Sequence, residues 1–198
     1  MKILRASGED EMLACFLQGE LSSPRFGPAT RDALAARGHS EELLSMPDLG
    51  DRQANAERRR LLAATRGYGE NRELFEHFPA RVRWVLARLT PAEMRRVRYV
   101  EYSYWNELSG GSRLPADAAV RIAEGVRAHG VSNRRFLDAA RALAHGASFP
   151  PLILVGQSRT ELVCLEGNLR LTAYAIEGFP IEVEALVGTA RTMARWAQ

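Results

Sequence analysis

A carboxylate and a guanidinium flank a single glycine in the segment Glu166–Gly167–Asn168–Leu169–Arg170. Arginine is permanently charged and its planar fork matches a phosphate group, so Arg170 is suited to neutralise the charge that grows during phosphoryl transfer. Glu166 could hold a metal ion or act as a general base in the same reaction. The backbone amides of Gly167 and Asn168 could cradle the phosphate. These residue types predict phosphate chemistry, with Glu166 and Arg170 as catalytic residues.

This chemistry requires a strand that turns directly into a helix at Gly167. Residues 161–165 form a short apolar run rich in strand-forming types, and apolar side chains then recur at helical spacing from Leu169 until Gly178. A helix that begins at such a turn directs unbonded N–H groups and the positive end of its dipole toward one point, which predicts an anion site. The alternative is that Gly167 only turns the chain and that the flanking acid and base form a surface ion pair.

The segment FPPLILVGQSRTELVCLEGNLRLTAYAIEGFPIEVEALV, residues 149–187, resembles the core of the ParB/sulfiredoxin superfamily, with a further first strand at residues 2–6. It has an apolar strand after Pro-Pro, a hairpin, a (D/E)-G-x-x-R turn, a helix and a last strand. The resemblance implies that Gly167, Asn168 and Arg170 surround a nucleotide phosphate. It also places Glu166 near that phosphate.

Asn168 departs from two branches of this superfamily. Sulfiredoxins carry a reactive cysteine at this position, and ParB clamp proteins commonly carry a glutamate that helps to hold the metal of a CTP complex. The Asp-Gly-His-x-Arg turn of the free-serine kinases is similar to residues 166–170. The resemblance therefore argues against sulfiredoxin activity and leaves phosphotransfer to a small molecule open.

The densest aromatic cluster of the chain lies in residues 99–108. Aromatic rings with hydroxyl tips suit a pocket that stacks a ring and orients it by hydrogen bonds. A predicted substrate pocket therefore consists of Tyr102, Tyr104, Trp105 and Glu107. The small-residue loop that follows could wrap a phosphate with backbone amides and contains Ser112 and Arg113. The alternative is an aromatic core seam followed by an ordinary loop between helices.

The predicted fold class is α/β (α+β), a small mixed sheet of four or five strands of the ParB/sulfiredoxin type. Its core is expected in residues 1–19 and 147–198. A large helical insertion, residues 20–146, is expected between strand 1 and the remaining strands. This helical subdomain would form the opposite wall of a cleft.

Two helices expected within the insertion carry arginines. Residues 51–66 include Arg58, Arg59 and Arg60, a run that is typical of a solvated face. A second helix is expected over residues 91–100, because Thr90-Pro91-Ala92-Glu93 combines a capping hydroxyl, a proline at the first helical position and a returning glutamate. These helices would be the recognition elements of a DNA-associated protein.

The composition of the 198 residues suits a globular protein, with 46% hydrophobic residues and a net charge of +3. This mild charge permits nucleic acid as a partner without favouring it. No run approaches 18 apolar residues, so we expect no membrane partner and a cytoplasmic location. Only two cysteines are present, and no Cys/His spacing matches a zinc site.

The leading hypothesis is a nucleotide-dependent phosphotransferase or hydrolase that acts on a small molecule. Its cofactor would be a nucleoside triphosphate or diphosphate with Mg²⁺, and Glu166 would hold the metal. The alternative is a ParB-like regulatory or DNA-associated protein that a nucleotide switches without phosphotransfer. A homodimer is compatible with either hypothesis.

Overall fold

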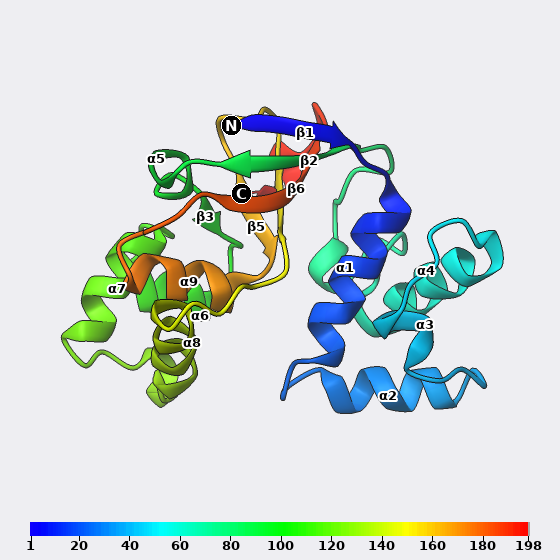
Figure 1. The fold of residues 1–198 in the computed structure, drawn as a ribbon, viewed down its shortest axis with the longest axis horizontal. Coiled ribbons are helices and arrows are strands. Elements are labelled where there is room, and N and C mark those ends of the chain that lie inside the picture. Colours follow the sequence, from blue (N-terminus) through cyan, green and yellow to red (C-terminus); the bar gives the residue numbers. More distant parts are fainter. Residues whose placement is uncertain (198) are drawn as a thin grey trace.

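The computed structural model describes residues 1–197 and has a mixed α/β fold. Within these residues one six-stranded sheet has the order β1-β2-β6-β4-β5-β3 (Figure 1). Its strands are β1 (Lys2–Ala6), β2 (Arg83–Leu89), β3 (Arg98–Tyr99), β4 (Leu152–Gly156), β5 (Val163–Glu166) and β6 (Val183–Thr189). Strand β6 is parallel to β4 and β3 is parallel to β5, whereas the other neighbours are antiparallel.

Helices surround this sheet, and most of them precede β4 in the chain. They are α1 (Glu9–Leu21), α2 (Gly27–Ala35), α3 (Glu42–Ser45), α4 (Arg52–Arg66), α5 (Pro91–Met94), α6 (Ser103–Ser109), α7 (Pro115–Ala123), α8 (Arg134–Ala144), α9 (Asn168–Ile176) and α10 (Ala194–Ala197), with single turns η1 (Glu73–Phe75) and η2 (Ala128–Gly130). No helix in residues 1–197 is long and apolar enough to cross a membrane.

The helices form two groups, one on each face of the sheet (Figure 1). Side chains of α1 to α4 pack with Ile153 and Val155 of β4, while side chains of α6 to α9 pack with Leu152 and Leu154. Because neighbouring residues of a strand point to opposite faces, β4 is buried along its whole length. The sheet is therefore the middle layer between two apolar cores.

The α/β fold class is confirmed, and so are the local elements around the glycine turn. Strand β1 spans the expected residues, and β4, β5, α9 and β6 follow in the expected order. The capping sequence before α5 also forms as expected. Glu93 accepts a hydrogen bond from the Thr90 backbone N–H at 2.9 Å and its own N–H donates to the Thr90 hydroxyl.

The expected insertion is not wholly helical, because β2 and β3 lie within residues 20–146 and pair into the sheet. Strand β2 is covered on both faces, so its sequence has no clean alternation of polar and apolar residues. The prediction of a helix over residues 91–100 is wrong beyond Met94, where α5 ends. Arg98 and Tyr99 instead pair with β5, and the strand register overrides the local helical pattern.

One arginine of the run in α4 points inward, contrary to expectation. Arg58 is 1% exposed and donates to the carbonyl oxygens of Leu43, at 2.9 Å, and of Asp48, at 3.2 Å. A buried guanidinium requires hydrogen-bond acceptors, and these two carbonyl oxygens supply them. The same bonds hold α3 and the following turn against α4.

The two cysteines lie on opposite sides of the sheet as free thiols. Cys164 of β5 is fully buried in the core beneath α6 to α9. Cys15 of α1 packs against the core beneath α1 to α4. Burial raises the pKa of Cys15 to about 12.

Candidate functional site

The glycine turn between β5 and α9 has the geometry that the sequence predicts. Gly167 is the N-cap of α9 and has a φ of 102°, in the left-handed region that glycine favours. A Cβ at this position would lie 2.5 Å from Cδ2 of Leu152. The turn therefore requires glycine both for its backbone conformation and for its close packing on β4.

The acid and base that flank the turn bind one another. Arg170 donates from Nη2 to the Glu166 carboxylate and, at 3.3 Å, to the Pro151 carbonyl oxygen. The side chains of Glu166 and Arg170 are 19% and 13% exposed. The buried Nε of Arg170 and Oδ1 of Asn168 have no hydrogen-bond partner within the described residues. The ion pair therefore satisfies only part of the hydrogen-bonding capacity at this helix end, and the Arg170 Nε and Asn168 Oδ1 atoms remain without a partner in the described residues.

A second acid, which the sequence did not single out, lies close to this pair. A Cβ on Gly19 of α1 would lie 2.9 Å from Cδ of Glu166, so α1 passes directly over the carboxylate. The next residue, Glu20, is buried and forms an ion pair with Arg66 of α4 at 3.1 Å. The only sequence signal was an acid within the apolar stripe of Phe16 and Leu17.

Burial raises the pKa of both carboxyl groups. Burial raises the pKa of Glu20 to about 7, while Arg66 lowers it and the charge of Glu166 raises it further. Burial likewise raises the pKa of Glu166, and Arg170 offsets part of that effect. Two acids with raised pKa values and two arginines thus meet between α1, α4 and the turn before α9, which is an arrangement suited to proton transfer.

The predicted phosphate loop is held by its own hydrogen bonds. Ser112 donates to the Ser109 carbonyl oxygen at 3.2 Å. Arg113 donates from Nε to the Tyr99 carbonyl oxygen at 3.0 Å and pairs with Glu101 at 2.7 Å. These contacts close the loop onto the end of β3.

The predicted aromatic pocket is split by the fold. Trp105 stacks on Tyr99 with ring centroids 4.5 Å apart and, like Tyr104, packs against the core. The Tyr104 hydroxyl is buried without a partner in the described residues. Tyr102 is 43% exposed, and Glu107 lies 3.3 Å from the His129 ring. Two of these residues are thus core aromatics, and the other two face outward.

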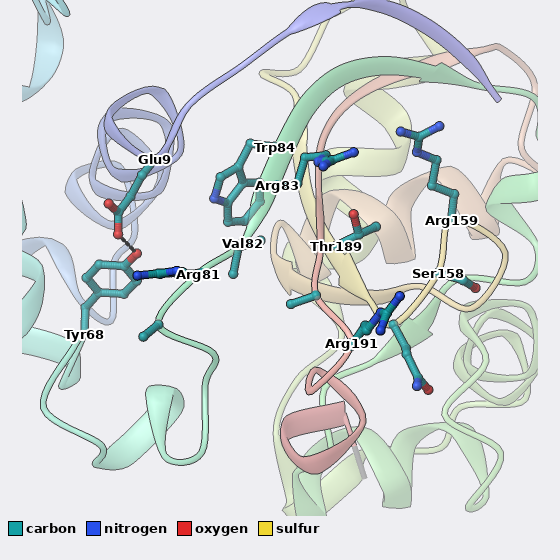
Figure 2. A pocket seen from close by; sticks show the side chains of 13 residues that line it. Glu9, Tyr68, Arg81, Val82, Arg83, Trp84, Ser158, Arg159, Thr189 and Arg191 are labelled. Atoms are coloured by element: carbon teal, nitrogen blue, oxygen red, sulfur yellow. Dashed lines mark hydrogen bonds between the residues drawn. The ribbon is translucent and has the colours of Figure 1, made fainter.

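An open concavity lies at the other end of the sheet, with a volume of about 900 Å³. We call it the arginine pocket, since Arg81, Arg83, Arg159 and Arg191 line it (Figure 2). The remaining lining residues are Glu9, Tyr68, Ala80, Val82, Trp84, Gln157, Ser158, Thr189 and Ala190. None of the catalytic, phosphate-binding or substrate-pocket residues predicted from the sequence lines this pocket.

The register of three strands explains why these arginines converge. Thr189 at the end of β6 is paired with Arg83 on one side and with Gly156 at the end of β4 on the other. Arg191 and Arg159 follow the carboxyl ends of these two parallel strands. Crevices outside the carboxyl ends of parallel strands are common ligand sites in α/β proteins. The sequence placed both arginines shortly after expected strands, but the pairing of the strands was needed to join them.

The four arginines of the arginine pocket are exposed, and their guanidinium groups have no ion pair or hydrogen-bond partner within residues 1–197. The carboxylate that lines the pocket, Glu9, already accepts a hydrogen bond from the Tyr68 hydroxyl (Figure 2). It is also bound by Arg59 of α4. The pocket therefore has a concentrated positive charge that the described protein groups leave uncompensated.

No group of three or more histidine, cysteine, aspartate or glutamate side chains in the described chain could hold a metal ion. Comparison of the chain with protein-family models, with curated proteins and with solved structures gave no match.

Proposed function

We propose that this protein binds a nucleotide, with its phosphate groups held in the arginine pocket. The observation that carries the proposal is the convergence of four exposed arginines without a partner in residues 1–197. Like charges held together repel one another, and an anion between them removes that cost. The guanidinium fork binds phosphate oxygens in pairs, so phosphate is the anion that fits this lining best.

The size and remaining lining of the pocket suit a small phosphorylated molecule. Its volume of about 900 Å³ is within the range of roughly 300–1,000 Å³ found for small-molecule sites. Ser158 and Thr189 contribute hydroxyl groups, and Val82 contributes apolar surface. These groups could orient a sugar or base while the arginines hold the phosphates.

Thermal unfolding in the presence of ATP, ADP, CTP and GTP, each with and without Mg²⁺, tests the proposal. A ligand at one hundred times its Kd stabilises the folded state by about 2.7 kcal/mol, which raises the Tm by several degrees. We expect this rise with at least one nucleotide and its loss in the variant Arg83→Gln/Arg159→Gln.

The matched control is Arg37→Gln/Arg127→Gln, which removes the same charge from two exposed arginines outside the pocket. This control should keep the nucleotide-induced rise in Tm. An unchanged rise in the pocket variant, or no rise with any nucleotide in the wild-type protein, would contradict the proposal.

Phosphotransfer or hydrolysis at the Glu166 turn is a second candidate function. The specific observation in its favour is that α1 passes over the Glu166 carboxylate at Gly19 and carries Glu20 as its next residue, so that two acids with raised pKa values, each with an arginine partner, belong to one region. The resemblance of residues 149–187 to the ParB/sulfiredoxin superfamily also favours it. Mg²⁺ is commonly held by one or two carboxylates together with phosphate oxygens, so Glu166 would share such an ion with the nucleotide.

Two measurements with each nucleotide and Mg²⁺ test this second function. Release of inorganic phosphate reports hydrolysis, and formation of the shortened nucleotide together with a phosphorylated product, from a panel of small hydroxyl acceptors, reports transfer. Arg170→Lys keeps the charge but removes the planar fork and should lower turnover at least tenfold. Retained turnover in Arg170→Lys and in Glu20→Gln would exclude the turn as the reacting centre.

A further inference from the structure

A second, smaller pocket with a volume of about 40 Å³ adjoins the arginine pocket at Arg159. Arg159 lines both pockets, and Arg96, which follows α5, lines the smaller one. Arg96 is exposed and its side chain has no partner within the described residues. The basic surface therefore extends beyond the space that a single nucleotide would occupy.

The acids along this surface are already neutralised by protein groups. Glu93, which lines the smaller pocket, accepts hydrogen bonds from the amino group of Met1 and from Thr90. Glu9, which lines the larger one, is bound by Arg59 and Tyr68. The carboxylates that line the two pockets, Glu9 and Glu93, are thus both bonded to other protein groups and leave the five arginines free for an anionic ligand.

We infer that Arg81, Arg83, Arg96, Arg159 and Arg191 bind the sugar-phosphate backbone of a single-stranded nucleic acid. This inference rests on the proposed phosphate-binding role of the arginine pocket and extends it to a longer ligand. In Figure 2 Arg81 and Arg159 lie on opposite sides of the pocket, with Arg83 and Arg191 between them. Arg96 lines the smaller pocket together with Arg159. A strand with one phosphate per nucleotide supplies charges along such a path.

The shape of the surface favours a single strand over a duplex. Duplex grooves are entered by a protruding helix or ribbon, whereas these arginines line a concavity at the ends of strands. Grooves that track one backbone are typical of proteins that bind single strands. Trp84 and Tyr68 of the lining are 4% and 7% exposed, so no open aromatic platform is present for base stacking. Binding is therefore independent of base sequence and dominated by phosphate contacts.

Fluorescence anisotropy with labelled 20-nucleotide oligothymidine, oligocytidine and a 20-base-pair duplex tests the inference. We expect both single strands to bind with similar Kd values and the duplex to bind more weakly. The logarithm of affinity should fall with the logarithm of salt concentration with a slope of about −3.5, from roughly −0.7 for each phosphate that one of the five arginines neutralises.

Arg96→Gln separates this inference from the proposed nucleotide site. The variant should weaken binding of the single strands at least threefold and make the salt slope about 0.7 less steep, because one phosphate contact is lost. The affinity for a mononucleotide should not change, since Arg96 lies outside the larger pocket. Arg37→Gln/Arg127→Gln is again the control and should bind the mononucleotide and the single strands as the wild-type protein does.

Mononucleotide binding without oligonucleotide binding would overturn the inference and leave the proposed nucleotide site intact. Tighter binding of the duplex, or an Arg96→Gln variant with wild-type affinity for single strands, would also overturn it. If neither mononucleotide nor oligonucleotide binds, the proposed function fails together with the inference. The Tm of each variant, measured without ligand, verifies that it is folded.

Discussion

Glu20 is a buried acid whose charge state changes near neutral pH. Its carboxyl group is buried between α1 and α4, where Arg66 lowers the pKa and Glu166 raises it, and Arg25 is a further cation that lowers it. The net effect of burial is a pKa of about 7 instead of 4.5. At pH 5 the folded protein therefore holds a proton on Glu20 that the unfolded chain has largely lost.

This difference in proton binding predicts the direction in which stability depends on pH. Between pH 4.5 and about 7 the folded state binds more protons at Glu20 than the unfolded state, so stability falls as the pH rises through this window. The change amounts to roughly 2–3 kcal/mol. We expect Glu20→Gln, which cannot ionise, to remove this decline from the free energy of unfolding measured by urea denaturation at pH 5 and pH 8.

Glu124→Gln is the matched control, since Glu124 is exposed and has no side-chain partner within the described residues. Its free energy of unfolding should decline with pH as that of the wild-type protein does. If Glu20→Gln declined to the same extent, the pH dependence would have to come from other groups, and Glu20 would not have the raised pKa.

At the scale of elements, the junction of β5 and α9 depends on two separate properties of Gly167. Its φ of 102° is costly for any residue with a Cβ, and a Cβ would also contact Leu152 at 2.5 Å. Gly111 has a φ of 91° and no atom within 4 Å of its virtual Cβ. The two glycines therefore differ mainly in packing, which allows conformational strain and steric overlap to be distinguished.

We expect Gly111→Ala to lower the free energy of unfolding by about 1–2 kcal/mol, the ordinary cost of a left-handed residue. Gly167→Ala should cost about 1–3 kcal/mol more, because the buried Leu152 side chain and the Arg170 guanidinium must move to admit the methyl group. Chemical denaturation of both variants measures the difference. Equal losses would show that the turn can absorb the methyl group without disturbing β4.

The elements that the sequence predicted are those whose signals are local. The run before Gly167, the helical spacing after it and the capping residues Thr90 and Glu93 each lie within one segment. The elements that were missed depend on distant partners. Strand β2 is recognisable only once β1 and β6 lie beside it, and β3 only once β5 does. A strand that is covered on both faces has no alternation of polar and apolar residues, so it can be assigned only when its neighbouring strands are known.

The same limit applies to the whole molecule, where the arginine pocket combines three segments that are far apart in sequence. The residues before β2, after β4 and after β6 meet only because Thr189 pairs with both Arg83 and Gly156. By contrast, Glu166 and Arg170 could be paired from the sequence, since they are four residues apart on one turn. Their contact with α1 could not, because it requires the helix to cross the face of the sheet.

The gathering of charge in the arginine pocket predicts a salt effect on stability. Exposed like charges repel at low ionic strength and are screened at high ionic strength, over a distance of about 10 Å at 0.1 M salt. We expect Arg83→Gln/Arg159→Gln to be as stable as the wild-type protein or more stable in 10 mM NaCl, and to lose that advantage in 0.5 M NaCl. Urea denaturation at both salt concentrations measures this difference.

Arg37→Gln/Arg127→Gln, which removes two arginines from separate surfaces, should show no comparable dependence on salt. A pocket variant that is less stable than the wild-type protein at low salt would mean that the arginines stabilise the fold rather than repel one another. That result would also remove the electrostatic basis of the proposed phosphate site.

One thiol lies on each side of the sheet, so the reactivity of the two thiols can report local opening of each side separately. Cys164 belongs to the core beneath α6 to α9, and Cys15 packs against the core beneath α1 to α4. Cys164 is fully buried and Cys15 is partly buried, and burial raises the pKa of both thiols, so both react slowly in the folded state. An increase in the rate at which an alkylating reagent modifies each thiol therefore reports opening of that side of the molecule. Mass spectrometry of the two peptides would thus show whether the helical layers detach together or one at a time.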